Sequence, residues 1–288
     1  MTAFVLSLLA NVSNASFIAR ATQAWTRAGF GLILKYSVSN FEVGSAIMSK
    51  KMSDTQMIEA LTKFDTATIC NVTATYTGSP LCLNLYDQWW GEYYTDTSLH
   101  CMYPDMKPIC GYAATAWYSD KLPQYSDVGR FALFDHLDAT PKPIVLVAKQ
   151  SFSNPKLKRL CGLFGGNMTA QFKAFGVQGI VTDGPLRDLE EIRPQKVQYL
   201  AQGLTSGHGD LQMRAAGIPV KVAGMCVTPG DIVHVDQCGA AKFPARYLPQ
   251  VLDFATKLLQ GEEKQKAVFQ DPSFNYQKWK AAQSAPKK

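Results

Sequence analysis

The chain has 288 residues, of which 47% are hydrophobic and 18% charged, a composition typical of a globular rather than a disordered protein. The formal net charge is +6, but residues 1–52 carry five basic residues against one acid, Glu42, and so account for +4 of it. Because no basic stripe with interleaved aromatic residues follows, nucleic-acid binding is not expected. A membrane span is not expected either, since no run of about 18 apolar residues occurs.

The seven cysteines form no Cys-x-x-Cys pair and have no zinc-site spacing. Their number is odd and several lie in apolar runs. This pattern favours buried free thiols in a reducing compartment.

Residues 1–47 are rich in alanine, serine and apolar residues and contain Arg20 and Arg27 but almost no acid. No positive charge precedes the apolar run at residues 4–9, which disfavours a secretory signal, and the composition is closer to an organellar transit peptide. The alternative is a weakly ordered extension before a start near Met48 or Met52. We therefore expect an N-terminal extension over residues 1–52. The expected location is cytoplasmic, or mitochondrial if residues 1–47 act as a transit peptide.

Hydrophobic spacing and turn residues predict alternating helices and strands after this extension. The predicted helices lie at residues 53–63, from a cap at 64–66 to residue 75, at 126–139, between Gly166 and Gly176, and at 248–280. The predicted strands lie at residues 108–115, 143–148, 179–182, 197–201, 219–223 and, after a turn, 230–236. Residues 76–105 are predicted to be a long aromatic loop or lid, with core packing as the alternative.

The order of these elements does not match the common nucleotide-binding or hydrolase folds. The strands of the second half are short and close together, unlike a regular Rossmann succession. No G-x-G-x-x-G follows a first strand, and Walker and G-x-S-x-G motifs are lacking. Dinucleotide, ATP and serine-hydrolase functions therefore lose their usual support.

Residues 165–188 combine the parts of an anion and metal site in one short unit. Gly165 and Gly166 precede a short helix, whose free N–H groups favour a bound carboxylate or phosphate. Arg187 and Asp188 follow the predicted strand at 179–182, at its carboxyl end, where α/β ligand sites usually lie. A helix–strand connection with a surface ion pair is the alternative.

Taken together, these segments resemble the RraA-like family, which contains regulators of ribonuclease activity and the class II pyruvate aldolases. The resemblance runs in order from about Thr62 to about Phe274. Its motifs are Asp-Thr-Ala-Thr at 65–68, Gly-Tyr-Ala-Ala-Thr at 111–115, Gly-Gly-Asn-Met at 165–168, Asp-Gly-Pro-Leu-Arg-Asp at 183–188, Gly-Leu at 203–204, His-Gly at 208–209, Gly-Ile-Pro-Val at 217–220, Pro-Gly-Asp-Ile-Val-His at 229–234 and the turn at 236–239.

The resemblance implies an α/β fold, a compact β/β/α sandwich of the swivelling-domain type. One domain would span residues 53–280, with an aromatic insertion at 76–105, a C-terminal helical segment at 248–280 and a frayed tail at 281–288. It also implies a homotrimer or hexamer with the active site at the subunit interface. The expected partner is a small 2-oxo acid substrate, with no nucleic acid and no membrane.

In the aldolase branch of the family, the arginine and aspartate after the strand are the discriminating pair. The resemblance therefore implies a metal-dependent lyase that releases pyruvate. The reactions would be cleavage of 4-hydroxy-4-methyl-2-oxoglutarate or 4-carboxy-4-hydroxy-2-oxoadipate, or decarboxylation of oxaloacetate. Asp188 would hold Mg²⁺ or Mn²⁺, and Arg187 would stabilise the charge on the C2 oxygen. The turn residues Gly165, Gly166, Asn167 and Met168 would bind the substrate together with Arg187.

Further residues are weaker candidates. Relatives bring a glutamate from a neighbouring subunit, a role open to Glu262 or Glu263, although a solvated helix face explains them equally well. His208 follows a glycine and is either a site residue or a structural turn residue. Asn71 departs from the family, which often has aspartate there.

Two other functions stay open: a non-catalytic regulator or scaffold, and a pathway-specific aldolase or hydrolase that acts on a larger oxo acid.

Overall fold

The computed structural model describes residues 52–284, except residues 77 and 90. The N-terminal extension and its interpretation as a transit peptide lie outside these residues, as does the end of the predicted frayed tail. The described residues belong to one compact unit.

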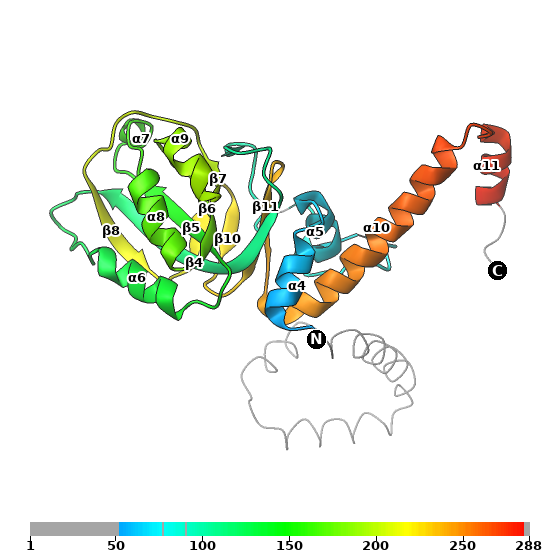
Figure 1. The fold of residues 1–288 in the computed structure, drawn as a ribbon, viewed down its shortest axis with the longest axis horizontal. Helices are drawn as coiled ribbons and strands as arrows, with labels where there is room; N and C mark the ends of the chain where they lie inside the picture. Colours follow the sequence, from blue (N-terminus) through cyan, green and yellow to red (C-terminus); the bar gives the residue numbers. More distant parts are fainter. Residues whose placement is uncertain (1–51, 77, 90, 285–288) are drawn as a thin grey trace, which may run out of the picture. The chain divides into compact units, whose positions relative to one another are not determined.

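An eight-stranded sheet forms the centre of the described residues (Figure 1). Its order is β12-β11-β4-β5-β6-β7-β3, with β8 paired to β4 off this path. Strands β4 to β7 run parallel, whereas β3, β8, β11 and β12 are antiparallel to their neighbours. The strands are β3 (His100–Cys101), β4 (Ile109–Asp120), β5 (Ile144–Ser151), β6 (Val177–Thr182), β7 (Gln198–Ala201), β8 (Leu211–Ala216), β11 (Ile232–Asp236) and β12 (Gly239–Phe243).

Two different layers cover the two faces of this sheet. One face packs against helices α6 (Arg130–Ala139), α8 (Gly166–Ala174) and α9 (Leu189–Ile192) through Leu133, Phe172 and Ile192 (Figure 1). The other face packs against the hairpin of β9 (Val220–Val222) and β10 (Met225–Val227). Alternate residues of β4 serve the two layers, because neighbouring side chains of a strand point to opposite faces.

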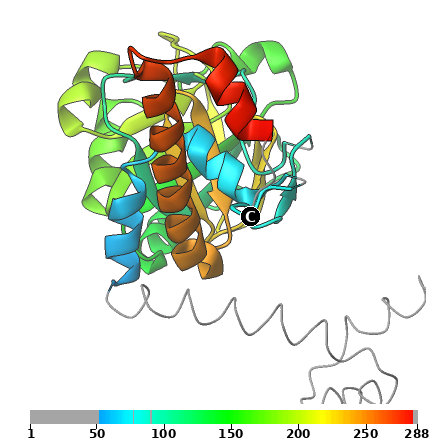
Figure 2. The same cartoon turned by 90° about the vertical axis from the view of Figure 1, so that its right-hand side faces the viewer.

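A third cluster forms where α10 (Leu248–Gln270) packs against α4 (Asp54–Leu61) and α5 (Thr66–Thr73), as Figure 2 shows. The helix α11 (Tyr276–Ser284) follows α10 after a break. The remaining short elements are β1 (Ala74–Thr75), β2 (Tyr86–Asp87), α7 (Pro155–Lys158) and the 3₁₀ turns η3 (Arg193–Gln195) and η4 (Ala245–Tyr247).

The predicted α/β fold class is confirmed, as are the predicted helix starts at residues 53 and 65. Ser53 forms a capping box with Gln56, and the Asp65 carboxylate accepts the Thr68 N–H. Both caps satisfy helix N–H groups that would otherwise lack acceptors. The predicted strands all occur, whereas β8, β10 and β12 were not predicted.

Several predicted segments differ in detail. The helix predicted at 126–139 begins only at Arg130, after a loop. The segment 76–105 is mostly loop, but Tyr93 and Tyr103 are buried in the core, so part of it is packing rather than lid. The predicted C-terminal helix is two helices, interrupted at 271–275 where Pro272 lies, and α11 continues to Ser284 beyond the expected start of the frayed tail.

The two faces of the strand at 232–236 have different surroundings. Val233 and Val235 pack in the hairpin cluster, while His234 and Asp236 hold the start of α5. The Thr66 N–H donates to Asp236 Oδ2 at 2.8 Å, and Thr66 Oγ1 lies 2.9 Å from His234 Nδ1. These two polar residues therefore have a structural role at the join between sheet and helices.

All seven cysteines are free thiols, as predicted, but only Cys82, Cys110 and Cys161 are buried, and Cys238 is exposed. Among the residues that the structure describes, none lies in a helix both long and apolar enough to span a bilayer.

Candidate active site

Arg187 directly follows Leu186, which pairs with two other segments of the chain. Leu186 is fully buried and bridges in parallel to Phe164 on one side and Leu204 on the other. The Arg187 N–H donates to the Phe164 carbonyl at 3.0 Å. This pairing fixes the backbone at the carboxyl end of β6, so the Arg187 side chain lies beside the Gly165–Gly166 turn.

Asp188 has a left-handed backbone, with φ 61° and ψ 38°. Its Oδ2 accepts the Gly166 N–H at 3.3 Å and lies 3.6 Å from Arg187 Nε. A Cβ added to Gly165 would collide with the Asp188 carboxylate. The glycine turn and the Arg187–Asp188 pair, 22 residues apart in the sequence, therefore form one site, and glycine is needed for their close approach.

A cavity of about 410 Å³ opens beside this pair, lined by Arg187, Asp188, Leu189, Leu204, Thr205 and Ser206. Arg187 Nε is buried and has no hydrogen-bond acceptor within the described residues, although the whole side chain is 37% exposed. Buried donors are normally paired. An unpaired guanidinium N–H next to a cavity is suited to donate to an oxygen of a bound ligand.

Sequence reasoning missed one carboxylate of the site. Glu191 is exposed, but its carboxylate lies against Gly166, where an added Cβ would collide with it. Its spacing of three residues from Asp188 could have signalled this, because residues three apart share a helix face. Gln195 Nε2 further ties this region together by donating to the Gly166 carbonyl at 2.9 Å.

The first N–H groups of α8 differ in whether they already have a hydrogen-bond acceptor. Gly166 was predicted to bind the substrate carboxylate, but its N–H already donates to Asp188. Gly165, the residue before the helix, provides no side-chain cap. The N–H groups of Asn167 and Met168 are therefore the ones left for an anion, since the first turn of a helix has no internal acceptors for them.

His208 and Glu262 have other partners within the described residues. The His208 ring is exposed and its Nδ1 lies 2.9 Å from the carbonyl oxygen of Gly209. Glu262 pairs with Lys266 at 3.6 Å on α10, which packs against α4 and α5 on another side of the sheet from α8 and α9 (Figure 1). One chain therefore does not bring Glu262 or Glu263 to Arg187, and a role from a neighbouring subunit stays a prediction.

The oxygen ligands available at this site suit a magnesium ion that is held by few protein groups. Within residues 52–284, apart from the two gaps, no three His, Cys, Asp or Glu residues converge as a metal site. Mg²⁺ is often bound by one or two carboxylates, with substrate and water oxygens completing its shell. Asp188 fits that role, because its Oδ1 makes no hydrogen bond within the described chain while Oδ2 is held by the turn.

Cys161 lies close to this site but is not suited to be a nucleophile. Burial raises the pKa of its thiol, and the nearby positive charge of Arg187 only partly opposes this. The thiol therefore stays protonated near neutral pH, and it donates to the His208 carbonyl.

The family model described as Aldolase/RraA matches residues 66–241, a range that contains every part of this site. The chain belongs to the RraA-like family. The predicted resemblance is thereby confirmed, and the match extends from the start of α5 to β12.

Curated relatives of this RraA-like chain match it over shorter segments. A protein of Burkholderia multivorans named "Putative 4-hydroxy-4-methyl-2-oxoglutarate aldolase" is 38% identical over 82 residues, or 27% of this chain and 49% of that protein. An uncharacterized protein of Methanocaldococcus jannaschii is 30% identical over 103 residues, or 35% of this chain and 50% of that protein. The chain thus spans about half the length of these relatives.

A solved structure supports the fold over a longer range. Streptomyces coelicolor RraAS2, described as an unusual member of the RNase ES inhibitor RraA protein family, superposes with a TM-score of 0.56 at 24% identity. The match covers 75% of this chain and 98% of that one. At this identity the likeness establishes the RraA-like fold alone.

Proposed function

We propose that the protein is a divalent-metal-dependent lyase that cleaves a carbon–carbon bond of a 2-oxo acid and releases pyruvate. Candidate reactions are retro-aldol cleavage of a 4-hydroxy-2-oxo diacid and decarboxylation of oxaloacetate. The observation that carries the proposal is the orphaned Arg187 Nε beside the Asp188 carboxylate, at the edge of a cavity and next to a helix start.

The chain's own groups would bind and orient the substrate. The N–H groups of Asn167 and Met168, at the positive end of α8, would donate to the C1 carboxylate. Arg187 Nε would donate to the C2 oxygen. Asp188 would hold the metal, which when bound supplies a Lewis acid for the 2-oxo group.

Both reactions break a bond to C3 and leave an electron pair that develops into the enolate of pyruvate. The negative charge then grows on the C2 oxygen, so a hydrogen bond from Arg187 strengthens as the bond breaks. Retro-aldol cleavage also needs a base that takes the proton of the C4 hydroxyl, whereas decarboxylation releases CO₂ directly. In both reactions C3 of the enolate then takes up a proton to give pyruvate, and the enolate is common to the two. One site could therefore perform both.

The test is release of pyruvate from oxaloacetate by the purified protein, measured through lactate dehydrogenase and NADH. Because metal ions alone also accelerate this decarboxylation, each rate is compared with buffer that contains the same Mg²⁺ and no protein. We expect protein-dependent turnover that stops with EDTA and in Asp188→Asn but persists in Glu190→Gln. Glu190 is the matched control, since its carboxylate is exposed and lies 3.9 Å from Arg193 Nε.

The regulator alternative predicts a different outcome of the same assay. A non-catalytic scaffold would give no turnover above the metal blank with oxaloacetate or with either 4-hydroxy-2-oxo diacid. Turnover of the diacids without turnover of oxaloacetate would instead favour an enzyme for a larger oxo acid.

A further inference from the structure

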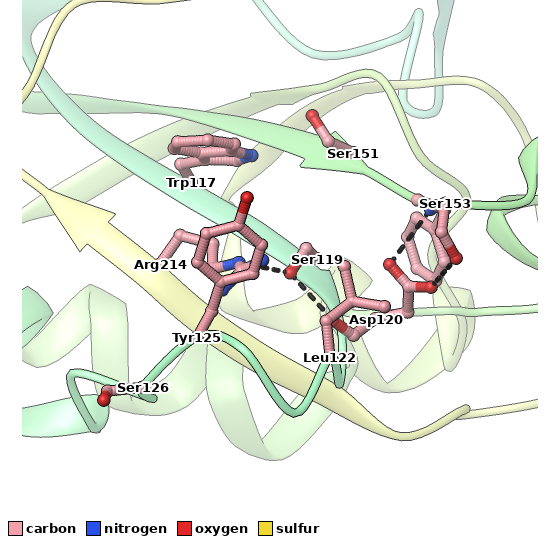
Figure 3. Close-up of a pocket in the computed structure, with 10 residues that line it drawn as sticks. Trp117, Ser119, Asp120, Leu122, Tyr125, Ser126, Ser151, Ser153 and Arg214 are labelled. Atoms are coloured by element: carbon pink, nitrogen blue, oxygen red, sulfur yellow. Dashed lines mark hydrogen bonds between the residues drawn. The ribbon is translucent and has the colours of Figure 1, made fainter.

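A second cavity, of about 380 Å³, lies at the carboxyl ends of β4 and β5 and is not part of the proposed active site (Figure 3). Its lining comes from these two strands, from β8 and from the segment after β4. None of its residues lines the cavity beside Arg187. The lining residues are Trp117, Ser119, Asp120, Leu122, Tyr125, Ser126, Ser151, Phe152, Ser153 and Arg214.

A β-bulge presents Arg214 to this cavity. Trp117 pairs with Ala215 while the next residue, Tyr118, pairs with Met213, so Arg214 is the extra residue that has no partner on β4. Bulges of this kind re-aim a side chain and often occur beside functional sites. Strands β4 and β8 therefore belong to the sheet and also place the Arg214 cation at its edge.

The Arg214 guanidinium is held rigidly by its neighbours. Its Nε donates to Ser119 Oγ at 2.7 Å, and its central carbon lies 3.6 Å from the centroid of the Tyr125 ring. Figure 3 shows the guanidinium behind the Tyr125 ring, facing Ser119. Within the described chain, the two terminal nitrogens make no hydrogen bond and no ion pair. Arg214 thus keeps its planar pair of donors for an external acceptor.

Trp117 adds a second unused donor. Its indole Nε1 is buried, and within the described residues it has no hydrogen-bond acceptor, although the residue lines the cavity. Ser119 and Ser151 are register partners on β4 and β5, so their hydroxyls lie on the same face of the sheet as Trp117. The cavity therefore contains donors in excess.

The one carboxylate in the lining, Asp120, does not satisfy these donors. It accepts the N–H of Ser153 at 3.1 Å and also the Ser153 hydroxyl. Burial by itself would raise the pKa of Asp120, but these hydrogen bonds and the positive charge of Arg214 outweigh it and lower the pKa, so the group stays ionised. The rest of the lining is aromatic or apolar, chiefly Trp117, Tyr125, Phe152 and Leu122.

We propose that this cavity binds a small carboxylate with a flat apolar body. The carboxylate would accept from Arg214 and from Trp117 Nε1, and the flat body would pack among the aromatic rings. A volume of about 380 Å³ falls in the range of small-molecule sites. The site stands independently of the proposed lyase function.

The first test uses benzoate as the probe and the indole N–H resonance of Trp117, assigned from Trp117→Phe, as the readout. We expect benzoate at millimolar concentrations to shift this resonance saturably, whereas benzamide, its neutral isostere, has no such effect. Inorganic phosphate separates a general anion site from the proposed one. If phosphate shifts the resonance as benzoate does, or if benzoate has no effect, the proposal is wrong.

The second test measures benzoate affinity by calorimetry in arginine variants. Arg214→Gln should weaken binding by about tenfold or more, the usual effect of losing a charge-assisted hydrogen bond. Arg246→Gln is the matched control, because Arg246 also stacks on a tyrosine, Tyr247, but lies outside the cavity. If Arg214→Gln fails to fold, Arg214→Lys replaces it and should also weaken binding, since the planar fork is lost. Unchanged affinity in the folded variant would overturn the proposal.

Discussion

The backbone N–H of Gly166 donates to Oδ2 of Asp188 across 3.3 Å. This bond joins the start of α8 to the residue before α9, and it places a carboxylate at the positive end of a helix, where negative charge is stabilised. It also orients Asp188 so that Oδ2 faces the turn while Oδ1 makes no hydrogen bond within the described residues. The glycine turn thus positions the proposed metal ligand.

The first prediction concerns the charge of Asp188. Asp188→Asn should abolish Mg²⁺-dependent pyruvate release while the protein keeps its fold, because asparagine tolerates the left-handed backbone and still accepts from Gly166. Activity is measured with oxaloacetate and the fold by circular dichroism. Near-normal turnover in the asparagine variant would end the metal-ligand proposal.

The second prediction concerns Gly166. Gly166→Ala should raise KM for oxaloacetate by about tenfold or more, because an added methyl group would displace the Glu191 carboxylate and obstruct approach to the helix start. The double variant with Glu191→Ala removes that collision. If KM returns to normal in the double variant, the effect of Gly166→Ala would come from the displaced Glu191 and not from a direct obstruction of the substrate.

The third prediction distinguishes transition-state stabilisation from simple binding by Arg187. Arg187→Ala should lower kcat by on the order of 10²–10³ with a smaller rise in KM, and Arg187→Lys should recover little. Steady-state kinetics with oxaloacetate and with a 4-hydroxy-2-oxo diacid test this. If Arg187→Ala impaired only one of the two reactions, the proposal that both pass through the same enolate would be wrong.

The fourth prediction concerns the acid sensitivity of the fold. Burial lowers the pKa of His234, and smaller influences such as the negative charge of Asp236 oppose this. The unfolded chain protonates this imidazole below about pH 6.5, but the folded protein does so at lower pH, so unfolding takes up a proton and stability falls as the pH drops below about 6.5. The slope from one such group stays under about 1.4 kcal/mol per pH unit.

Denaturant unfolding between pH 5.5 and 7.5 measures this effect. His234→Gln should be less stable at pH 7.5, because the bonds to Thr66 and Leu61 are disturbed, and it should show a flatter acid slope. The exposed His208, changed to Gln, provides the control. Burial also lowers the pKa of His136, which accounts for the slope that remains. An unchanged slope in His234→Gln would refute the assignment.

Local patterns in the sequence were sufficient to predict much of the fold. The caps at Ser53 and Asp65 and the apolar strand at 143–148 depend on neighbours in the sequence, so periodicity and cap residues predicted them. Strand β12 was missed because Gly239 and the two alanines after it have little strand character. Its pairing with β11 supplies the missing stability.

The proximity of the glycine turn to Arg187 and Asp188 was anticipated, but the sharing of groups between them was not. Gly166 was expected to serve the substrate, yet its N–H is used by Asp188, and the exposed Glu191 carboxylate lies against Gly166. Both facts depend on the bridges of Leu186 to Phe164 and Leu204. Such parallel contacts between distant segments leave no periodic pattern in the sequence.

The amino-acid sequence by itself determined the family, the order of the main elements and the residues of the glycine turn and the Arg187–Asp188 pair, because these depend on local spacing and motif order. The tertiary structure alone decided which donors stay unpaired. Nothing in the sequence marks Trp117 or Arg214, and nothing in it indicates that Arg187 Nε has no acceptor. Arg187 Nε and Trp117 Nε1 are unpaired because packing removes them from water without supplying an acceptor, whereas Arg214 is held through its Nε by Ser119.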